Sequence, residues 1–429
     1  MATVFQQVLD RENRANPWPL YAELRRNRVV REPDDRYVVS RYRDIVALLH
    51  DPRVSSHVPE EFGGPAAEAA RSFINLDPPD HDRVRRILNR HYGPPETPGR
   101  IDGMRPELLE IVTELIDRMV GRAEIDVVDD LAYPFPVTVI CRLLGVPVED
   151  EPRFHVWADT IVEGVGPTGA VSGEARAERE RAFAELGAYL GELADARCDL
   201  PGEDLMSALV TDDGELGRIP HAELERNLAL LLVAGHETTV NLIANGMLTL
   251  LRNPDVLARI RQDPLYAIPT VEELLRYEPP VQLLPNRVAL ADIDIAGTTI
   301  PAGSQITLVL AAGNRDPDHV RDPDRFDPRR FDPEGPTADR ESAQHLGFGG
   351  GVHHCFGAPL ARQEAQIALV ELARRLDNPR LLADPPPYRP NAVLRGPRHL
   401  PIAVDRVNPE DIPRARRPAE HPAATRESR

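Results

Sequence analysis

The sequence contains no lysine, so arginine supplies all 51 of its basic side chains. Acidic residues number 69, and the formal net charge is −18 at pH 7. A nucleic-acid-binding surface needs an excess of positive charge, so this balance argues against general binding to DNA or RNA. The planar guanidinium suits carboxylates better than a lysine ammonium does.

Cysteine is also scarce: the chain has Cys141, Cys198 and Cys355, and no CxxC pair. Three thiols at these spacings do not indicate a disulfide framework, and they fit a reducing cytosol. The N-terminus lacks the apolar run of a signal peptide, and no stretch of about 20 apolar residues is present to span a bilayer. We therefore expect a cytoplasmic protein without membrane contact.

The length and composition of the chain are sufficient for a globular fold. The chain has 429 residues, of which 41 % are hydrophobic, 5 % are aromatic and 43 are proline. This composition supports a sizeable core with many stiff loops. With no internal repeat and no linker between two cores, we expect one domain over residues 1–407 and a disordered tail over 408–429.

Periodicity predicts a mainly α fold with a minor β component. The helices are expected at about 17–27, 43–50, 173–197, 220–251 and 357–376, and the strands at about 37–40, 292–295, 298–300 and 305–310. The 220–251 segment is apolar on all sides at its middle, which is typical of a helix buried in a core.

The segment FGGGVHHCFG at residues 348–357 carries the strongest chemical signal. Consecutive glycines let the backbone approach a flat group closely. Cys355 directly precedes a predicted helix, whose free N–H groups favour a thiolate, and such a sulfur is a suitable axial ligand for haem iron. A buried structural cysteine, or a zinc site with His353 and His354, would explain the same residues, although no second ligand cluster for zinc is present.

This segment resembles the haem-binding loop of the cytochrome P450 superfamily, in which Phe348, Gly351, His353, Cys355 and Gly357 occupy the motif positions. The likeness runs from about residue 15 to 407. It implies a triangular helical fold whose long central helix lies over haem b. Cys355 would be the iron ligand, Phe348 would shield its sulfur, and His353 would bind a haem propionate. Gly349 and Ala234 are also expected at the cofactor.

Residues 234–239, AGHETT, lie midway along the longest predicted helix. Glycine in a helix interior costs about 1 kcal/mol relative to alanine, and next to a hydroxyl it can accompany a local bulge that holds O2 and water. Glu237 and Thr238 match the acid–alcohol pair that delivers protons in the resembled superfamily. By itself a Glu-Thr pair is more often a surface pair or a helix hydrogen bond.

Two further sets of charged residues follow from the resemblance. Glu273 and Arg276 form its ExxR motif, which Arg325 is expected to complete as a buried structural network; alone, the pair would be an ordinary surface ion pair. The haem propionates need cations. The expected partners are His81, Arg85, Arg287 and His353.

The substrate pocket is expected above the haem, with mostly apolar walls. Its predicted lining is Ile74, Val233, Ala234, Thr238, Leu283 and Leu284. The Gly/Ser-containing segment 162–175 and the residues just before Asp77 are expected to form a lid.

The sequence therefore predicts a monomeric monooxygenase that hydroxylates or epoxidises a small or medium-sized apolar molecule with O2, in bacterial secondary metabolism. Because the chain ends before another domain could follow Cys355, we expect its electrons to come from a separate ferredoxin and ferredoxin reductase. Arg83, Arg86, Arg90 and Arg362 are the candidate docking cations. Oxidative coupling or desaturation would use the same haem chemistry. A haem-thiolate sensor without turnover is the alternative from another class, although it would not need Glu237 and Thr238.

Overall fold

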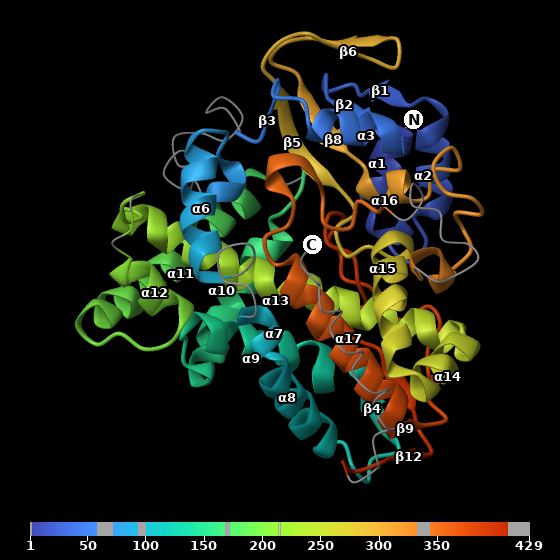
Figure 1. Ribbon diagram of the computed structural model, residues 1–429. Coiled ribbons are helices and arrows are strands. Elements are labelled where there is room, and N and C mark those ends of the chain that lie inside the picture. The colour runs from blue at the N-terminus through green and yellow to red at the C-terminus, as the bar shows by residue number, and fades with distance from the viewer. Residues whose placement is uncertain are drawn as a thin grey trace, which may run out of the picture.

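The computed structural model describes residues 2–57, 72–92, 100–167, 172–212, 214, 216–332 and 344–410. The helices occupy most of the molecule, and the largest sheet lies beside the N-terminal helices at one end (Figure 1). The expected tail falls almost entirely on residues 411–429, which lie outside the described residues, so that expectation stays a prediction.

The fold is mainly helical, as predicted. The helices are α1 (Val4–Leu9), α2 (Trp18–Arg26), α3 (Tyr42–Leu49), α6 (Asp80–Tyr92), α7 (Arg100–Gly103), α8 (Arg105–Asp117), α9 (Pro134–Leu144), α10 (Glu151–Glu163), α11 (Gly173–Asp199), α12 (Leu205–Thr211), α13 (His221–Arg252), α14 (Pro254–Gln262), α15 (Ala267–Tyr277), α16 (Leu310–Asn314) and α17 (Ala358–Arg375). The five helices predicted from periodicity are α2, α3, α11, α13 and α17, with ends within two residues.

The strands form small sheets. The largest has the order β1 (Val29–Arg31), β2 (Tyr37–Val39), β8 (Gln305–Leu308), β5 (Leu284–Ala289) and β3 (Val54–Ser55). The others pair β10 (Arg380–Leu381), β11 (Pro401–Ala403) and β4 (Glu124–Asp126); β12 (Arg406–Val407) with β9 (Leu376–Asp377); and β6 (Ile293–Ile295) with β7 (Thr298–Ile300). In the largest sheet β2 and β8 are parallel, which joins residues 37–39 to residues 306–308.

Helix α13 is the centre of the helical core. Its 32 residues span about 48 Å at 1.5 Å per residue. It packs against α9, α11, α15 and α17, and a Cβ at Gly246 would lie 3.1 Å from Leu274 of α15 and 3.2 Å from Leu369 of α17. Among the described residues it is also the helix that is long and apolar enough to cross a membrane, and most of that apolar stretch is buried inside the fold.

A buried ionic network joins α15 to the irregular segment before the cysteine loop. Arg276 Nε donates to Glu273 Oε2 at 2.7 Å, and neither side chain is exposed. The Arg276 guanidinium also donates to the carbonyl oxygens of Asn314, Pro323 and Arg325. One arginine thus ties three chain segments together.

The expected role of the Arg325 side chain is wrong. Arg325 contributes its backbone carbonyl, while its side chain is exposed. The second guanidinium at Glu273 belongs to the buried Arg330, whose Nε lies 3.5 Å from Glu273 Oε1. The signal was present but ambiguous, because PDRF at 323–326 is followed by PRRF at 328–331. Only the path of the backbone turns the second arginine inward.

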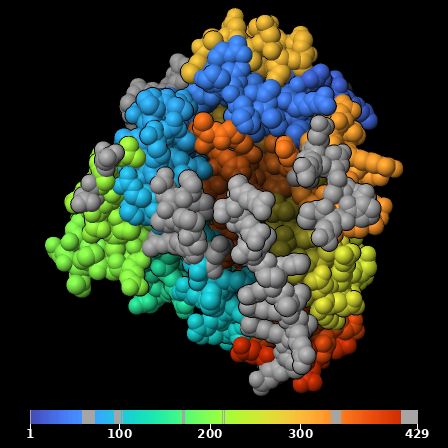
Figure 2. Space-filling model, in the orientation of Figure 1, coloured from blue at the N-terminus to red at the C-terminus, as the bar shows by residue number. Residues whose placement is uncertain are grey.

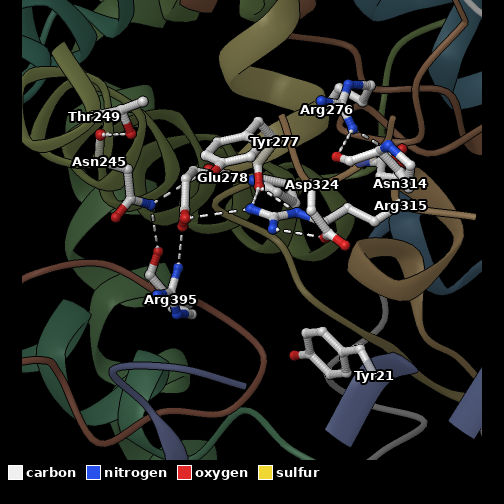
Figure 3. A network of polar contacts seen from close by, with 12 residues as sticks. Tyr21, Asn245, Thr249, Arg276, Tyr277, Glu278, Asn314, Arg315, Asp324 and Arg395 are labelled. Carbon is white, nitrogen blue, oxygen red and sulfur yellow. Dashed lines mark hydrogen bonds and ion pairs between the residues drawn. The ribbon is translucent and has the colours of Figure 1, made fainter. Parts of the chain in front are cut away.

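Polar contacts continue from Arg276 to the residues at and just after the C-terminal end of α15 (Figure 3). Arg395 pairs with Glu278, and Asn245 Nδ2 on α13 donates to the Arg395 carbonyl at 2.9 Å. Arg315 donates to the Tyr277 carbonyl at 2.6 Å and to Asp324 at 3.2 Å. These bonds fasten the C-terminal segment around residue 395 to α13, close to the cavity described below.

The two arginines provide a matched test of the network. We expect Arg330→Ala to lower the free energy of unfolding by about 1–3 kcal/mol, because the buried Glu273 loses an ion-pair partner and the Asp322 carbonyl loses its hydrogen-bond donor. Arg325→Ala should change it by less than about 0.5 kcal/mol, as for an exposed side chain. Urea denaturation measures both. Equal losses, or a larger loss for Arg325→Ala, would contradict the assignment of Arg330.

Candidate active site

The cysteine loop is held in one shape by its glycines and by backbone hydrogen bonds. Gly349 and Gly351 have φ angles of +68° and +64°, in the region that favours glycine. A Cβ at Gly351 would also lie 2.0 Å from the Leu49 carbonyl oxygen of α3, so no side chain fits there. The Cys355 N–H donates to the Phe348 carbonyl at 2.9 Å, which closes the loop.

The Cys355 sulfur lies between this loop and the start of α17. The backbone N–H groups of Gly357 and Ala358 hydrogen-bond the sulfur and favour its anionic form, as do the positive charges of Arg85 and Arg362. Burial acts the other way and raises the pKa of the thiol. A cationic iron at the sulfur would supply the stabilisation that burial removes. Within the described part of the chain, the cluster suited to a metal ion is Asp126, Asp129 and His399, so the geometry does not support zinc at Cys355.

A cavity of about 1110 Å3 separates the cysteine loop from α13. Ligand pockets commonly measure about 300–1,000 Å3, so this one has room for a flat cofactor and a second molecule. It is lined by the loop residues Phe348, Gly349, Gly351, His353, Cys355 and Gly357, and by the six predicted pocket residues Ile74, Val233, Ala234, Thr238, Leu283 and Leu284. The structure thus brings the predicted iron ligand and the predicted pocket together in one space.

Three polar side chains, Arg85, Arg287 and His353, line one side of this cavity, and His81 lies next to His353. The His81 and His353 rings lie 4.5 Å apart, and the buried atoms Nε2 of His81 and Nδ1 of His353 have no hydrogen-bond partner among the described residues. Burial, followed by the positive charge of Arg287, lowers the pKa of His353 to about 4. Burial also lowers the pKa of Arg85 and of Arg287. Carboxylates entering here would meet Arg85, Arg287 and His353, with His81 beside them, so these residues fit the propionates of a haem.

The contacts of Thr238 agree with the prediction from the AGHETT motif, whereas those of Gly235 differ from it. Thr238 Oγ1 donates to the Ala234 carbonyl at 3.0 Å, the hydroxyl–carbonyl bond that the motif indicated. The expected bulge is absent, and α13 continues as a regular α-helix from His221 to Arg252. Gly235 instead permits close packing, since a Cβ there would lie 2.8 Å from Ile140 Cδ1 of α9.

Glu237 is buried and ion-paired, which sequence reasoning did not foresee. Its Oε1 lies 3.1 Å from Arg389 Nη1 and accepts from Asn241 Nδ2 at 3.3 Å. Burial raises the pKa of Glu237 to about 7, against the opposing charge of Arg389. Arg389 comes from the C-terminal segment, 152 residues away along the chain. The available signal was the polar stripe of Glu237, Asn241 and Asn245 on an otherwise apolar helix.

Other expected residues are placed as follows. Phe348 lies under the guanidinium of Arg362, which is 4.5 Å from its ring centroid. Three of the candidate docking cations are engaged in ion pairs: Arg83 with Glu223, Arg90 with Asp212 and Arg362 with Glu272. Arg86 is exposed, and its guanidinium donates to the Asp82 carbonyl. Of the expected lid, residues 168–171 lie outside the described residues, and 164–167 line the cavity.

Comparison with known proteins shows the family to which the chain belongs. The family model described as "Cytochrome P450" matches residues 197–399. The cytochrome P450 monooxygenase PikC of Streptomyces venezuelae is 41 % identical over 416 residues, covering 92 % of each chain. The 6-deoxyerythronolide B hydroxylase of Saccharopolyspora erythraea is 34 % identical and covers 90 % of this chain and 95 % of its own. The ligand-free crystal structure of CYP164A2 from Mycobacterium smegmatis superposes with a TM-score of 0.83 at 41 % identity, covering 94 % of this chain and 99 % of that one.

The position of Glu237 predicts a pH-dependent stability. The pKa of Glu237 is about 7 in the folded protein and near 4.5 for an ordinary glutamate, so folding favours the protonated form. The stability this provides is complete below about pH 4.5 and is lost as the pH rises through 7. Glu237→Gln abolishes the titration. We therefore expect the free energy of unfolding of this variant, relative to the unsubstituted protein, to rise between pH 5 and pH 8, measured by urea denaturation at several pH values.

An exposed carboxyl group provides the control. Glu149 is exposed, and Glu149→Gln should give a difference that stays flat across the same pH range. A flat difference for Glu237→Gln as well would show that Glu237 does not titrate in the folded protein between these limits.

Proposed function

Because the chain belongs to the cytochrome P450 family, and is therefore a haem-binding monooxygenase, we propose that it inserts one atom of O2 into a small or medium-sized, largely apolar molecule. The observation that carries this proposal is the single cavity shared by Cys355 and by Glu237 and Thr238 of α13. Keeping both an acid and an alcohol at a thiolate site supports turnover over a sensor role, since sensing needs no proton delivery.

The residues proposed to bind haem and those proposed to deliver protons lie on two sides of the cavity. Bound haem supplies the iron at which O2 is reduced. Cys355 would hold that iron, with Phe348 beside the sulfur, while His81, Arg85, Arg287 and His353 would hold the propionates. These assignments rest on the loop geometry and on the unpartnered polar atoms.

Protons would arrive from the α13 side. Glu237, with a pKa of about 7, can take up and release a proton at neutral pH, which a glutamate of ordinary pKa does poorly. The Thr238 hydroxyl gives its own hydrogen to the Ala234 carbonyl, so its oxygen remains free to accept a hydrogen bond within the cavity. Arg389 would keep Glu237 in place between proton transfers.

The kind of oxidation is part of the proposal. Hydroxylation or epoxidation fits the mostly apolar walls. Named relatives of similar identity include a vitamin D(3) 25-hydroxylase and a nocardicin C N-oxygenase, so closely similar chains oxidise different molecules at different atoms. Coupling or desaturation would need only a different substrate placement. PikC is a protein of Streptomyces venezuelae and 6-deoxyerythronolide B hydroxylase one of Saccharopolyspora erythraea, and these bacterial sources support our proposal of a role in bacterial secondary metabolism. We further propose that the protein acts as a cytoplasmic monomer.

Electrons would come from a separate ferredoxin and its reductase. The orange segment near residue 350 reaches the surface beside the light-blue α6 in Figure 2, and Val352 in that loop is 50 % exposed. An electron donor bound at this surface would lie close to Cys355. Because Arg83, Arg90 and Arg362 are already ion-paired, Arg86 is the cation left to attract an acidic partner among the four we considered.

The ligand assignment predicts a spectroscopic loss. Reduced, carbon-monoxide-bound protein should absorb at about 450 nm, as thiolate-ligated haem does. Cys355→Ala should abolish this band, whereas Cys198→Ala, which removes an exposed thiol, should keep it. A band that survives in Cys355→Ala would show that another group holds the iron.

The role of Thr238 predicts uncoupling. With a substrate found by its shift of the haem absorption band, we expect Thr238→Ala to lower the product formed per reductant consumed by about tenfold or more, with hydrogen peroxide released instead. Thr238→Ser keeps the hydroxyl and should keep most of the coupling. Reductant oxidation, peroxide and product are measured together, and unchanged coupling in Thr238→Ala would rule out the proposed role.

A further inference from the structure

One face of α11 lines the cavity with three charged side chains and one aromatic side chain. Arg176, Arg179, Glu180 and Phe183 all line it, and they stand at positions i, i+3, i+4 and i+7 of the helix. This spacing places them on one helical face. The sequence had indicated only a charged amphipathic helix here, so this stripe was not assigned to the site.

Arg179 is the cation of this stripe that forms no ion pair or hydrogen bond with the described residues. Its stem runs against α10 where Gly164 leaves room: a Cβ at Gly164 would lie 2.7 Å from both Cβ and Cδ of Arg179. Burial lowers the pKa of Arg179, and the like charge of Arg176 acts in the same direction. Among the described residues, no carboxylate forms an ion pair with it. Arg179 is half-buried and lines the cavity, so its guanidinium is available to an anionic group of a molecule bound there.

The other charged groups of the cavity have partners or belong to the haem side. Glu237 pairs with Arg389, and Asp51 pairs with Arg53. Burial raises the pKa of Glu364 well above its ordinary value, and this side chain is hydrogen-bonded to that of Thr239. Arg85 and Arg287 are the cations assigned above to the propionates. Arg179, on a different helix from these, is left as a cation for the second molecule in the cavity.

Glu180 follows Arg179 and moderates its charge. The carboxylate of Glu180 raises the pKa of Arg179 through their opposite charges, yet the two groups are not ion-paired. A neighbouring negative charge of this kind weakens the attraction of any anion to Arg179. Replacing Glu180 and replacing Arg179 should therefore change anion binding in opposite directions.

We propose that Arg179 binds the carboxylate of the substrate, so that the protein acts on an apolar carboxylic acid whose hydrocarbon part extends toward Thr238. The apolar walls given by Val233, Leu283 and Leu284 suit such a chain. This inference rests on the proposed monooxygenase function and adds the class of substrate. A carboxylate meets the planar fork of arginine with two parallel hydrogen bonds, which a neutral alcohol cannot do.

The test compares two probes of equal chain length, dodecanoate and dodecan-1-ol, on the haem-loaded enzyme at pH 7.5. Binding is measured by isothermal titration calorimetry and by the shift of the haem absorption band. The unsubstituted protein should bind the acid at least about tenfold more tightly than the alcohol. Arg179→Gln should weaken binding of the acid by about tenfold and leave the alcohol unchanged, and Arg179→Lys should restore part of the loss.

Glu180→Gln completes the design, because it should tighten binding of the acid by about threefold without affecting the alcohol. The proposal is overturned if the unsubstituted protein does not prefer the acid, or if Arg179→Gln weakens both probes alike. The absorption of the reduced carbon-monoxide complex at about 450 nm is recorded for each variant. Loss of that band in the unsubstituted protein would refute the proposed function itself, whereas an intact band with no preference for the acid would refute only the role of Arg179.

Discussion

The site depends on the confinement of one sulfur atom between a glycine loop and the first turn of α17. Cys355 can present its sulfur to the cavity because the loop passes closer to its neighbours than any side chain would allow. Gly351 lies against the backbone of α3, and a Cβ at Gly347 would lie 2.7 Å from the Leu275 carbonyl of α15. The loop is thus fixed from two sides by backbone, which cannot be displaced as readily as a side chain.

The same contacts explain why the ionic network of α15 matters for a loop that it does not contain. Arg276 pairs with Glu273 and donates to the Asn314 carbonyl, and the Asn314 side chain in turn accepts from the N–H of Leu346, just before the loop. A buried pair of this kind contributes little net stability by itself. Its role here is to position chain segments, because it fixes Asn314 relative to α15, and Asn314 in turn holds Leu346 at the start of the cysteine loop.

Arginine is well suited to this architecture. Arg276, Arg375 and Arg395 are fully buried, and each donates to backbone carbonyls as well as to a carboxylate. A guanidinium has five N–H donors in one plane, so it can satisfy several carbonyls from irregular segments at once. An ammonium group has three donors around a point. The absence of lysine therefore coincides with a fold whose irregular segments are joined by multivalent buried arginines.

The sequence by itself determined the mainly α fold class and the main helices, because these depend on local periodicity. Motifs a few residues long carried the resemblance to cytochromes P450, and that resemblance implied the cysteine loop and the residues that the structure places around the cavity. It did not distinguish Arg325 from Arg330, since two PxRF segments are locally equivalent and only the backbone path places one guanidinium at Glu273. Nor did it identify Arg389 as the partner of Glu237, or Arg179 as a cavity residue. Those contacts join segments far apart in the chain, and only tertiary packing decides which charged side chains share a buried space and which face water.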